Sequence, residues 1–240
     1  MTIEQSRDTR YDFEAPQAAS VHNPDLANRQ RSSKTGTLAQ APGEGDGDAE
    51  QVATASELAT AIQATDIVRI VVLSTHRELG SFGGLELARR LSGAGRGTVL
   101  IDLTPEGSVG GRMSLPPDAL GYADLLSGGA GLADIIYRDH YTSTHFVPTG
   151  GFEMETAEEA DLAHLGHVLD AFAEAYDYTV VEADPLDIPE LPALLDETTA
   201  VVIAGLPHVD DRMIDVADDL RMIGIEDIVF MPMVRRTTAE

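Results

Sequence analysis

Apolar and polar positions follow a regular pattern from Val68 almost to the end of the chain. Short apolar runs rich in β-branched residues predict buried strands. The predicted strands are residues 68–74, 98–103, 144–150, 178–185, 199–205 and 226–232. Their apolar residues are continuous rather than alternating with polar ones. This pattern is typical of a parallel sheet covered on both faces.

Stretches with helical spacing separate these strands. The predicted helices are residues 84–95, 122–128, 131–138, 156–176 and 210–224, and a short helix at 56–64 has Ser56 as its N-cap. Strands alternating with helices predict an α/β domain of three layers with a mostly parallel sheet. We expect the ordered domain to span residues 55–236.

Residues 1–50 lack this pattern. They are poor in large aliphatic side chains and end in the acidic stretch "APGEGDGDAE". Such a composition predicts a disordered acidic tail. The start has no apolar stretch typical of a secretory signal, and no apolar run approaches the ~20 residues of a membrane span. We therefore expect a cytoplasmic protein without direct membrane insertion.

The chain is strongly acidic. Its 240 residues carry a net charge of −25, and Lys34 is the one lysine. This charge repels nucleic acid and anionic lipid, so we expect neither as a direct partner. Solubility is the simplest role for the acidity. The absence of cysteine excludes disulfides, thiol catalysis and cysteine-ligated metals.

A sheet of this kind binds ligands at the carboxyl ends of its strands. Three predicted loops lie there, at residues 74–84, 102–112 and 182–189. The first belongs to the stretch "RIVVLSTHRELGSFGGLELARRL", which predicts a strand, a glycine-containing turn and a helix. Nucleotide-binding proteins place a phosphate loop in this position.

Three segments carry a resemblance to a known family. Residues 121–151, "GYADLLSGGAGLADIIYRDHYTSTHFVPTGG", are similar to the family's Gly-Leu-x-Asp-(Leu/Val)-Leu-x-Gly stretch and the strand that follows it. "YDYTVVEADP" resembles its Tyr-Asp-Tyr-Val-Ile-Ile-Asp-x-Pro-Pro motif, and "TVLIDLTPEG" resembles the strand that brings in its second acidic motif. The chain thus resembles the bacterial tyrosine kinases (BY-kinases) of exopolysaccharide and capsule synthesis, which are MinD/ParA-like P-loop ATPases. The resemblance implies a Rossmann-like, P-loop NTPase-type domain.

The resemblance also shows where the phosphate loop departs from the family. Gly80 stands at the position of the P-loop lysine, Ser81 keeps the hydroxyl position after it, and Phe82 replaces a small hydroxyl residue. His76 or Arg77 could place a cation nearby, although arginine does not substitute freely for a compact ammonium group. Gly80, Ser81, Gly83 and Gly84 remain candidates to approach a phosphate. The alternative is a glycine turn that packs the helix on the sheet.

The acidic positions are altered too. Asp102 matches the first aspartate of the family's Asp-x-Asp motif, while Thr104 stands at the second. Glu182 replaces the other Mg²⁺-associated aspartate, and Asp184 replaces a family proline. By resemblance, Asp102 and Glu182 complete a degenerate nucleotide site for which Mg·ATP is the candidate cofactor. No separate metal site and no catalytic residue are predicted.

The resemblance leads to three hypotheses. The first is a pseudokinase-like regulator or adaptor, non-catalytic or weakly catalytic, in exopolysaccharide (capsule or holdfast-type) synthesis or export. Its partners would be a membrane chain-length regulator or co-polymerase and further copies of itself, which would hold it at the inner membrane. The second is a divergent ATPase or protein tyrosine kinase, although no tyrosine follows Tyr178 to serve as the family's autophosphorylation target. A MinD/ParA-like positioning factor is the third, and the charge opposes it.

Several weaker features of the sequence can also be interpreted. His164 and His167 could share a metal, or could lie singly on a helix surface. Residues 182–197 are either a partner surface or an ordinary connection. Arg89 and Arg90 are expected on a solvated helix face. Three tyrosines could be phosphorylated or could pack their rings. They are Tyr122, Tyr137 and Tyr141.

Overall fold

The fold was taken from a computed structural model. The structure describes residues 51–77, 82–93, 95–104, 107–113, 115–116, 118–150, 159–184 and 191–233. The predicted tail, Gly80, Ser81 and the domain's predicted end at residue 236 lie outside these ranges. The two domain boundaries therefore stay predictions, although a first strand already begins at Gln51.

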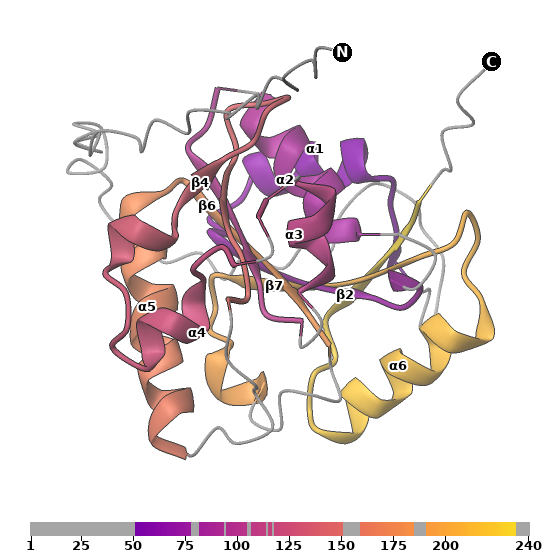
Figure 1. The fold of residues 1–240 in the computed structure, drawn as a ribbon. Coiled ribbons are helices and arrows are strands. Elements are labelled where there is room, and N and C mark those ends of the chain that lie inside the picture. The colour runs from indigo at the N-terminus through magenta and orange to yellow at the C-terminus, as the bar shows by residue number, and fades with distance from the viewer. Residues whose placement is uncertain are drawn as a thin grey trace, which may run out of the picture. The chain divides into compact units, whose positions relative to one another are not determined.

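The centre of the molecule is an eight-stranded sheet (Figure 1) with the order β1-β8-β7-β2-β6-β3-β5-β4. All neighbouring strands are parallel except β4 and β5. The strands are β1 Gln51–Val52, β2 Arg69–Ser74, β3 Thr98–Asp102, β4 Tyr137–Arg138, β5 His145–Val147, β6 Tyr178–Ala183, β7 Thr199–Gly205 and β8 Ile228–Pro232. The predicted α/β class with a mostly parallel sheet is confirmed, and each of the six predicted strands is present.

Helices cover both faces of this sheet, as Figure 1 shows. They are α1 Ala55–Gln63, α2 Gly83–Gly93, α3 Ser108–Arg112, α4 Tyr122–Leu126, α5 Glu159–Ala175 and α6 Asp211–Met222, with 3₁₀ helices η3 Leu132–Ile135 and η5 Leu191–Leu194. Side chains alternate across β2. Ile70 and Val72 join the core under α1 and α2, whereas Val71 and Leu73 join the core under α5 and α6.

Two local predictions were wrong. Residues 131–138 do not form one helix, because η3 ends at Ile135 and the chain continues as β4, paired antiparallel with β5. Thr54, not Ser56, caps α1. Its hydroxyl accepts a bond from the Glu57 amide (3.3 Å), and the Glu57 carboxylate accepts one from the Thr54 amide (2.9 Å). This reciprocal capping box satisfies two backbone donors at once.

Two short strands, β1 and β4, were not predicted from the sequence. Each has two residues and lies at an edge of the sheet, so neither shows an apolar run. Within the described ranges, none of the helices is long and apolar enough to cross a membrane.

Candidate nucleotide site at the carboxyl ends of the strands

Three polar side chains meet where β2, β3 and β6 end. Ser74 is the last residue of β2, and Asp102 is the last residue of β3. Glu182 lies on β6, directly paired with Asp102 across the ladder. All three are buried, Asp102 and Glu182 completely. The structure therefore brings the two predicted acidic residues together at the edge where this type of fold binds its ligands.

Gly83 and Gly84 begin α2 at the same place. The Gly83 amide donates to the Ser74 hydroxyl (2.8 Å), and the Gly84 amide donates to Oε2 of Glu182 (2.7 Å). These amides belong to the first turn of a helix, where backbone donors have no partner within the helix itself. In a phosphate site, such donors point at the ligand. Here two of them bind side chains of the sheet.

Close packing explains why both positions are glycine. A Cβ on Gly83 would lie 2.2 Å from Cβ of Ala204, and one on Gly84 would lie 2.6 Å from Oε2 of Glu182. Neither distance is compatible with a real side chain. The structure thus supports the packing interpretation of these two glycines, in which they let α2 approach the sheet.

Glu182 has an unusual environment for a carboxyl group. Burial raises its pKa to about 8, and the charge of Asp102 adds to the shift, whereas Ser74, the Gly84 amide and Arg77 oppose it. The group is therefore mostly protonated at neutral pH. Its Oε2 accepts the bond from Gly84, while its Oε1 is buried and has no hydrogen-bond partner among the described residues.

Asp102 binds its own loop. Its Oδ1 accepts bonds from the amide (3.0 Å) and the hydroxyl (2.6 Å) of Thr104. Its Oδ2 accepts a bond from the Val109 amide in the first turn of α3 (3.2 Å). Thr149 reinforces the turn by donating to the carbonyls of Asp102 and Thr104. The threonine at the second acidic position thus serves as a hydrogen-bond partner of the first.

The two cations predicted near the phosphate loop also contact carboxylates. Nε2 of His76 lies 3.2 Å from Oδ2 of Asp210, the N-cap residue of α6. Arg77 binds Asp184 with Nη2 and Oδ2 2.6 Å apart. A phosphate would have to compete with these carboxylates for either side chain.

The tyrosines and histidines that were weaker candidates differ in their exposure to solvent. Tyr122 is buried, Tyr137 is partly buried and Tyr141 is 82% exposed, so burial removes Tyr122 as a site of phosphorylation. His164 and His167 are exposed on α5. The described residues contain no group of three or more acidic or histidine side chains that could hold a metal. Most of the acidic loop before η5 lies outside the described ranges.

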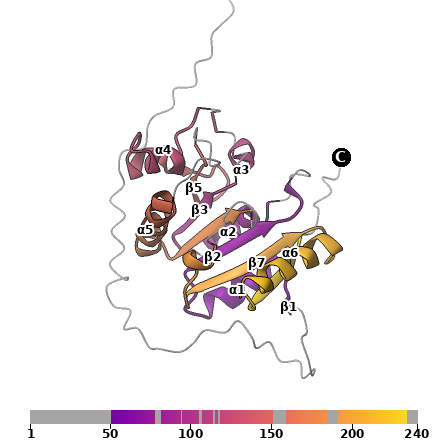
Figure 2. The same cartoon turned by 90° about the horizontal axis from the view of Figure 1, so that it is seen from below.

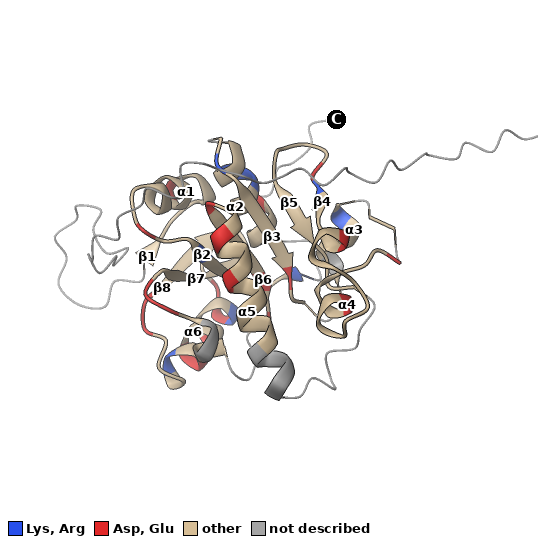
Figure 3. Ribbon diagram, turned by 90° about the vertical axis from the view of Figure 1, so that its left-hand side faces the viewer, with Lys and Arg blue, Asp and Glu red and all other residues tan. Residues whose placement is uncertain are grey.

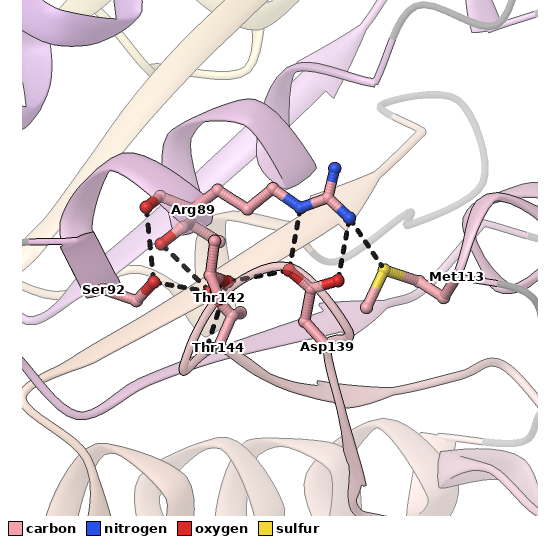
Figure 4. A network of polar contacts seen from close by, with 7 residues as sticks. Arg89, Ser92, Met113, Asp139, Thr142 and Thr144 are labelled. Atoms are coloured by element: carbon pink, nitrogen blue, oxygen red, sulfur yellow. Dashed lines mark hydrogen bonds and ion pairs between the residues drawn. The ribbon is translucent and has the colours of Figure 1, made fainter.

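Arg89 is not on a solvated face, and the prediction for it was wrong. Its guanidinium donates two bonds to Asp139 (2.9 and 2.8 Å), whose side chain is 1% exposed. Thr142 also donates to Asp139 (Figure 4). Arg89 lies over the ring of Tyr141, 5.2 Å from its centroid. This network ties the β4–β5 loop to α2. Neighbouring Arg90 pairs with exposed Glu86, as expected for a solvated face.

Sequence comparison identifies no relative: no family model matches, and no curated protein matches significantly. Structural comparison does find similar proteins. The kinase domain of VpsO is similar with a TM-score of 0.58 at 18% identity, covering 75% of this chain and 91% of that one. The kinase domain of the Escherichia coli tyrosine kinase ETK has a TM-score of 0.58 at 12% identity, covering 78% and 77%.

The chain has the fold of a BY-kinase domain. It is also similar to the septum site-determining protein MinD of Pyrococcus horikoshii, determined with Mg-ADP, with a TM-score of 0.51 at 17% identity over 68% of each chain. The resemblance to BY-kinases and MinD/ParA-like P-loop NTPases is thus confirmed for the fold.

Proposed function

We propose that this chain is a BY-kinase-like regulator or adaptor of exopolysaccharide synthesis or export, of the capsule or holdfast type, with little or no phosphoryl transfer of its own. One observation carries the proposal. The Gly83 and Gly84 amides, which a phosphate would need, bind Ser74 and Glu182 instead. The chain shares the fold of kinase domains, but side chains of the same chain already accept the hydrogen bonds of these two amides at the start of α2.

The charge of the site supports the same conclusion. Phosphoryl transfer requires cations to offset the charge of the β- and γ-phosphates. Residues 51–240 contain no lysine, and His76 and Arg77 contact Asp210 and Asp184. A triphosphate entering here would meet Asp102 and would have to displace Glu182 from Gly84.

The partner in this proposal is a membrane chain-length regulator or co-polymerase. The chain would dock onto it, alone or as a homo-oligomer, and so lie at the periphery of the inner membrane. The CapA2B2 chimera, a solved structure at 17% identity with a TM-score of 0.56, has a similar fold.

A divergent Mg·ATP-dependent ATPase or tyrosine kinase is the second candidate. It is favoured by the convergence of Ser74, Asp102 and Glu182 at the carboxyl ends of three neighbouring strands. In that case Glu182 would leave Gly84 when nucleotide binds, and its carboxylate would reach a water on Mg²⁺.

Calorimetry with the full chain separates the two candidates. ATP and ADP are titrated with Mg²⁺ at high protein concentration, and an active BY-kinase domain serves as the positive control. We expect no heat of binding. Micromolar binding that Asp102→Asn abolishes would establish the enzyme candidate instead. The variant Glu182→Ala is titrated in the same way, because it removes the carboxyl group that binds the Gly84 amide and adds no positive charge.

A further inference from the structure

The carboxyl end of α6 presents apolar side chains to solvent. Met222 is 84% exposed and Ile223 is 51% exposed. The helix stops here because Gly224, with φ 91°, takes the left-handed conformation that closes a helix, and Ile225 then turns into the core. Leu220 and Ile225 are the buried apolar side chains at this end of α6, whereas Met222 and Ile223 lie outside the core.

Acidic residues flank this apolar pair in the sequence. Asp219, Glu226 and Asp227 are exposed, and the described residues offer no ion-pair partner to any of them. Arg221 is nearby but pairs with Asp218 (3.0 Å). The backbone carbonyls at the end of a helix add partial negative charge. In Figure 3 the acidic positions along α6 are red.

A further exposed apolar side chain lies at the sheet edge. Val52 of β1 is 56% exposed and pairs with Phe230 in the middle of β8, the strand that follows α6. Paired residues in parallel strands point to the same face, so Val52 lies on the face that α6 covers. Figure 2 shows α6 over β7 on this side of the sheet. We call Val52, Met222, Ile223 and the three acidic residues the α6 edge surface.

We propose that the α6 edge surface docks a lysine- or arginine-rich amphipathic helix of a partner protein. Its apolar side chains would cover Met222, Ile223 and Val52, and its cations would face Asp219, Glu226 and Asp227. A second copy of this chain fits poorly, because each copy carries a net charge of −25. An added strand fits poorly as well, because β1 offers only two residues.

This surface is separate from the candidate nucleotide site. Asp210, which contacts His76, is at the opposite end of α6, about 18 Å away along a helix of this length. The docking proposal therefore stands or falls independently of nucleotide binding.

Fluorescence anisotropy with the full chain tests the proposal. The probe is a labelled Lys/Leu amphipathic helix of about 18 residues, and its Glu/Leu counterpart is the charge control. We expect the cationic peptide to bind and the acidic one not to bind. The double variant M222S/I223S and the triple variant D219N/E226Q/D227N should each weaken binding at least about fivefold, and the triple variant should also reduce its dependence on salt.

Matched variants elsewhere on the surface exclude a general charge effect. The triple variant D66N/D118N/E197Q removes the same charge from exposed positions, and L120S/L132S removes two other exposed apolar side chains. Each should change binding less than about twofold. Equal weakening by these controls, or no binding by the wild type, would overturn the proposal. Concentration-dependent dimerisation in sedimentation velocity, lost in M222S/I223S, would show that a second copy occupies the surface instead.

Discussion

At the residue scale, Glu182 sets the character of the candidate site. The family resemblance placed it at a Mg²⁺-associated position. In the structure Glu182 binds the start of α2 through the Gly84 amide. Burial makes the protonated form the stable one, since an ionised carboxylate loses hydration there that Ser74, the Gly84 amide and Arg77 do not fully replace.

The raised pKa of Glu182 predicts how stability depends on pH. Between its ordinary pKa of 4.5 and the folded value of about 8, the folded protein keeps a proton that the unfolded chain has lost. This group therefore makes the free energy of unfolding fall as pH rises through that window. Glu182→Gln, which mimics the neutral form, should remove this contribution. At pH 9 the variant should be more stable than wild type by on the order of 5 kcal/mol, and at pH 4.5 about equal.

Urea unfolding at a series of pH values measures this difference. Glu86→Gln is the matched control, because Glu86 is a half-exposed carboxyl group on α2, the helix whose first turn Glu182 binds. It should follow the wild-type curve. A constant difference between Glu182→Gln and wild type from pH 4.5 to 9 would contradict the assignment.

At the element scale, hydrogen bonds and ion pairs hold in place segments whose position the hydrophobic pattern does not predict. The β4–β5 loop is held to α2 by Arg89 and Asp139, and Thr144 adds a bond to Ser92 of the same helix (2.9 Å). Burial alone would raise the pKa of Asp139, but the bonds from Arg89 and Thr142 outweigh it, and the pKa is lowered. Asp139 is therefore a buried carboxylate whose charge is stabilised by Arg89.

Removing Arg89 should therefore be costly. Arg89→Met leaves the buried carboxylate without its cation and should lower the free energy of unfolding by on the order of 2 kcal/mol. The double variant R89M/D139N should recover part of this loss, because no buried charge remains unpaired. Arg90→Met, which breaks an exposed pair on the same helix, should cost no more than about 0.5 kcal/mol. Chemical denaturation of wild type and the three variants gives these free energies of unfolding. Equal losses for Arg89→Met and Arg90→Met would show that the Arg89–Asp139 pair stabilises the fold no more than an exposed pair does.

At the scale of the whole molecule, the mostly parallel sheet and the net charge dominate. The sheet gathers the ends of β2, β3 and β6 at one edge, and it leaves the short strands β1 and β4 at its borders. A net charge of −25 means that folding brings many like charges together. This repulsion is weakened by salt.

Salt should therefore stabilise this protein. Raising NaCl from about 20 to about 200 mM near pH 7.5 shortens the screening length and should raise the melting temperature by about 3 °C. The same addition near pH 4.4, the isoelectric point, should have little effect, because the net repulsion has gone. Differential scanning calorimetry at both pH values is the measurement. A melting temperature that falls with salt at pH 7.5 would mean that attractive ion pairs outweigh the repulsion.

The sequence by itself determined the architecture. Each buried strand of a parallel sheet needs apolar residues on both faces, so the six predicted strands and their order along the chain are visible as apolar runs. The positions of Asp102 and Glu182 at strand ends followed from the same pattern.

Only the tertiary structure decided what those residues contact. The bond from Gly84 to Glu182 joins residues 98 positions apart, and the bond from Arg89 to Asp139 joins residues 50 apart. Neither has a local signature, because each depends on how closely a helix packs on the sheet. The exposure of Met222 and Ile223 was hidden for a related reason: both are apolar residues at the end of a predicted helix, and only the packed fold shows where the core ends.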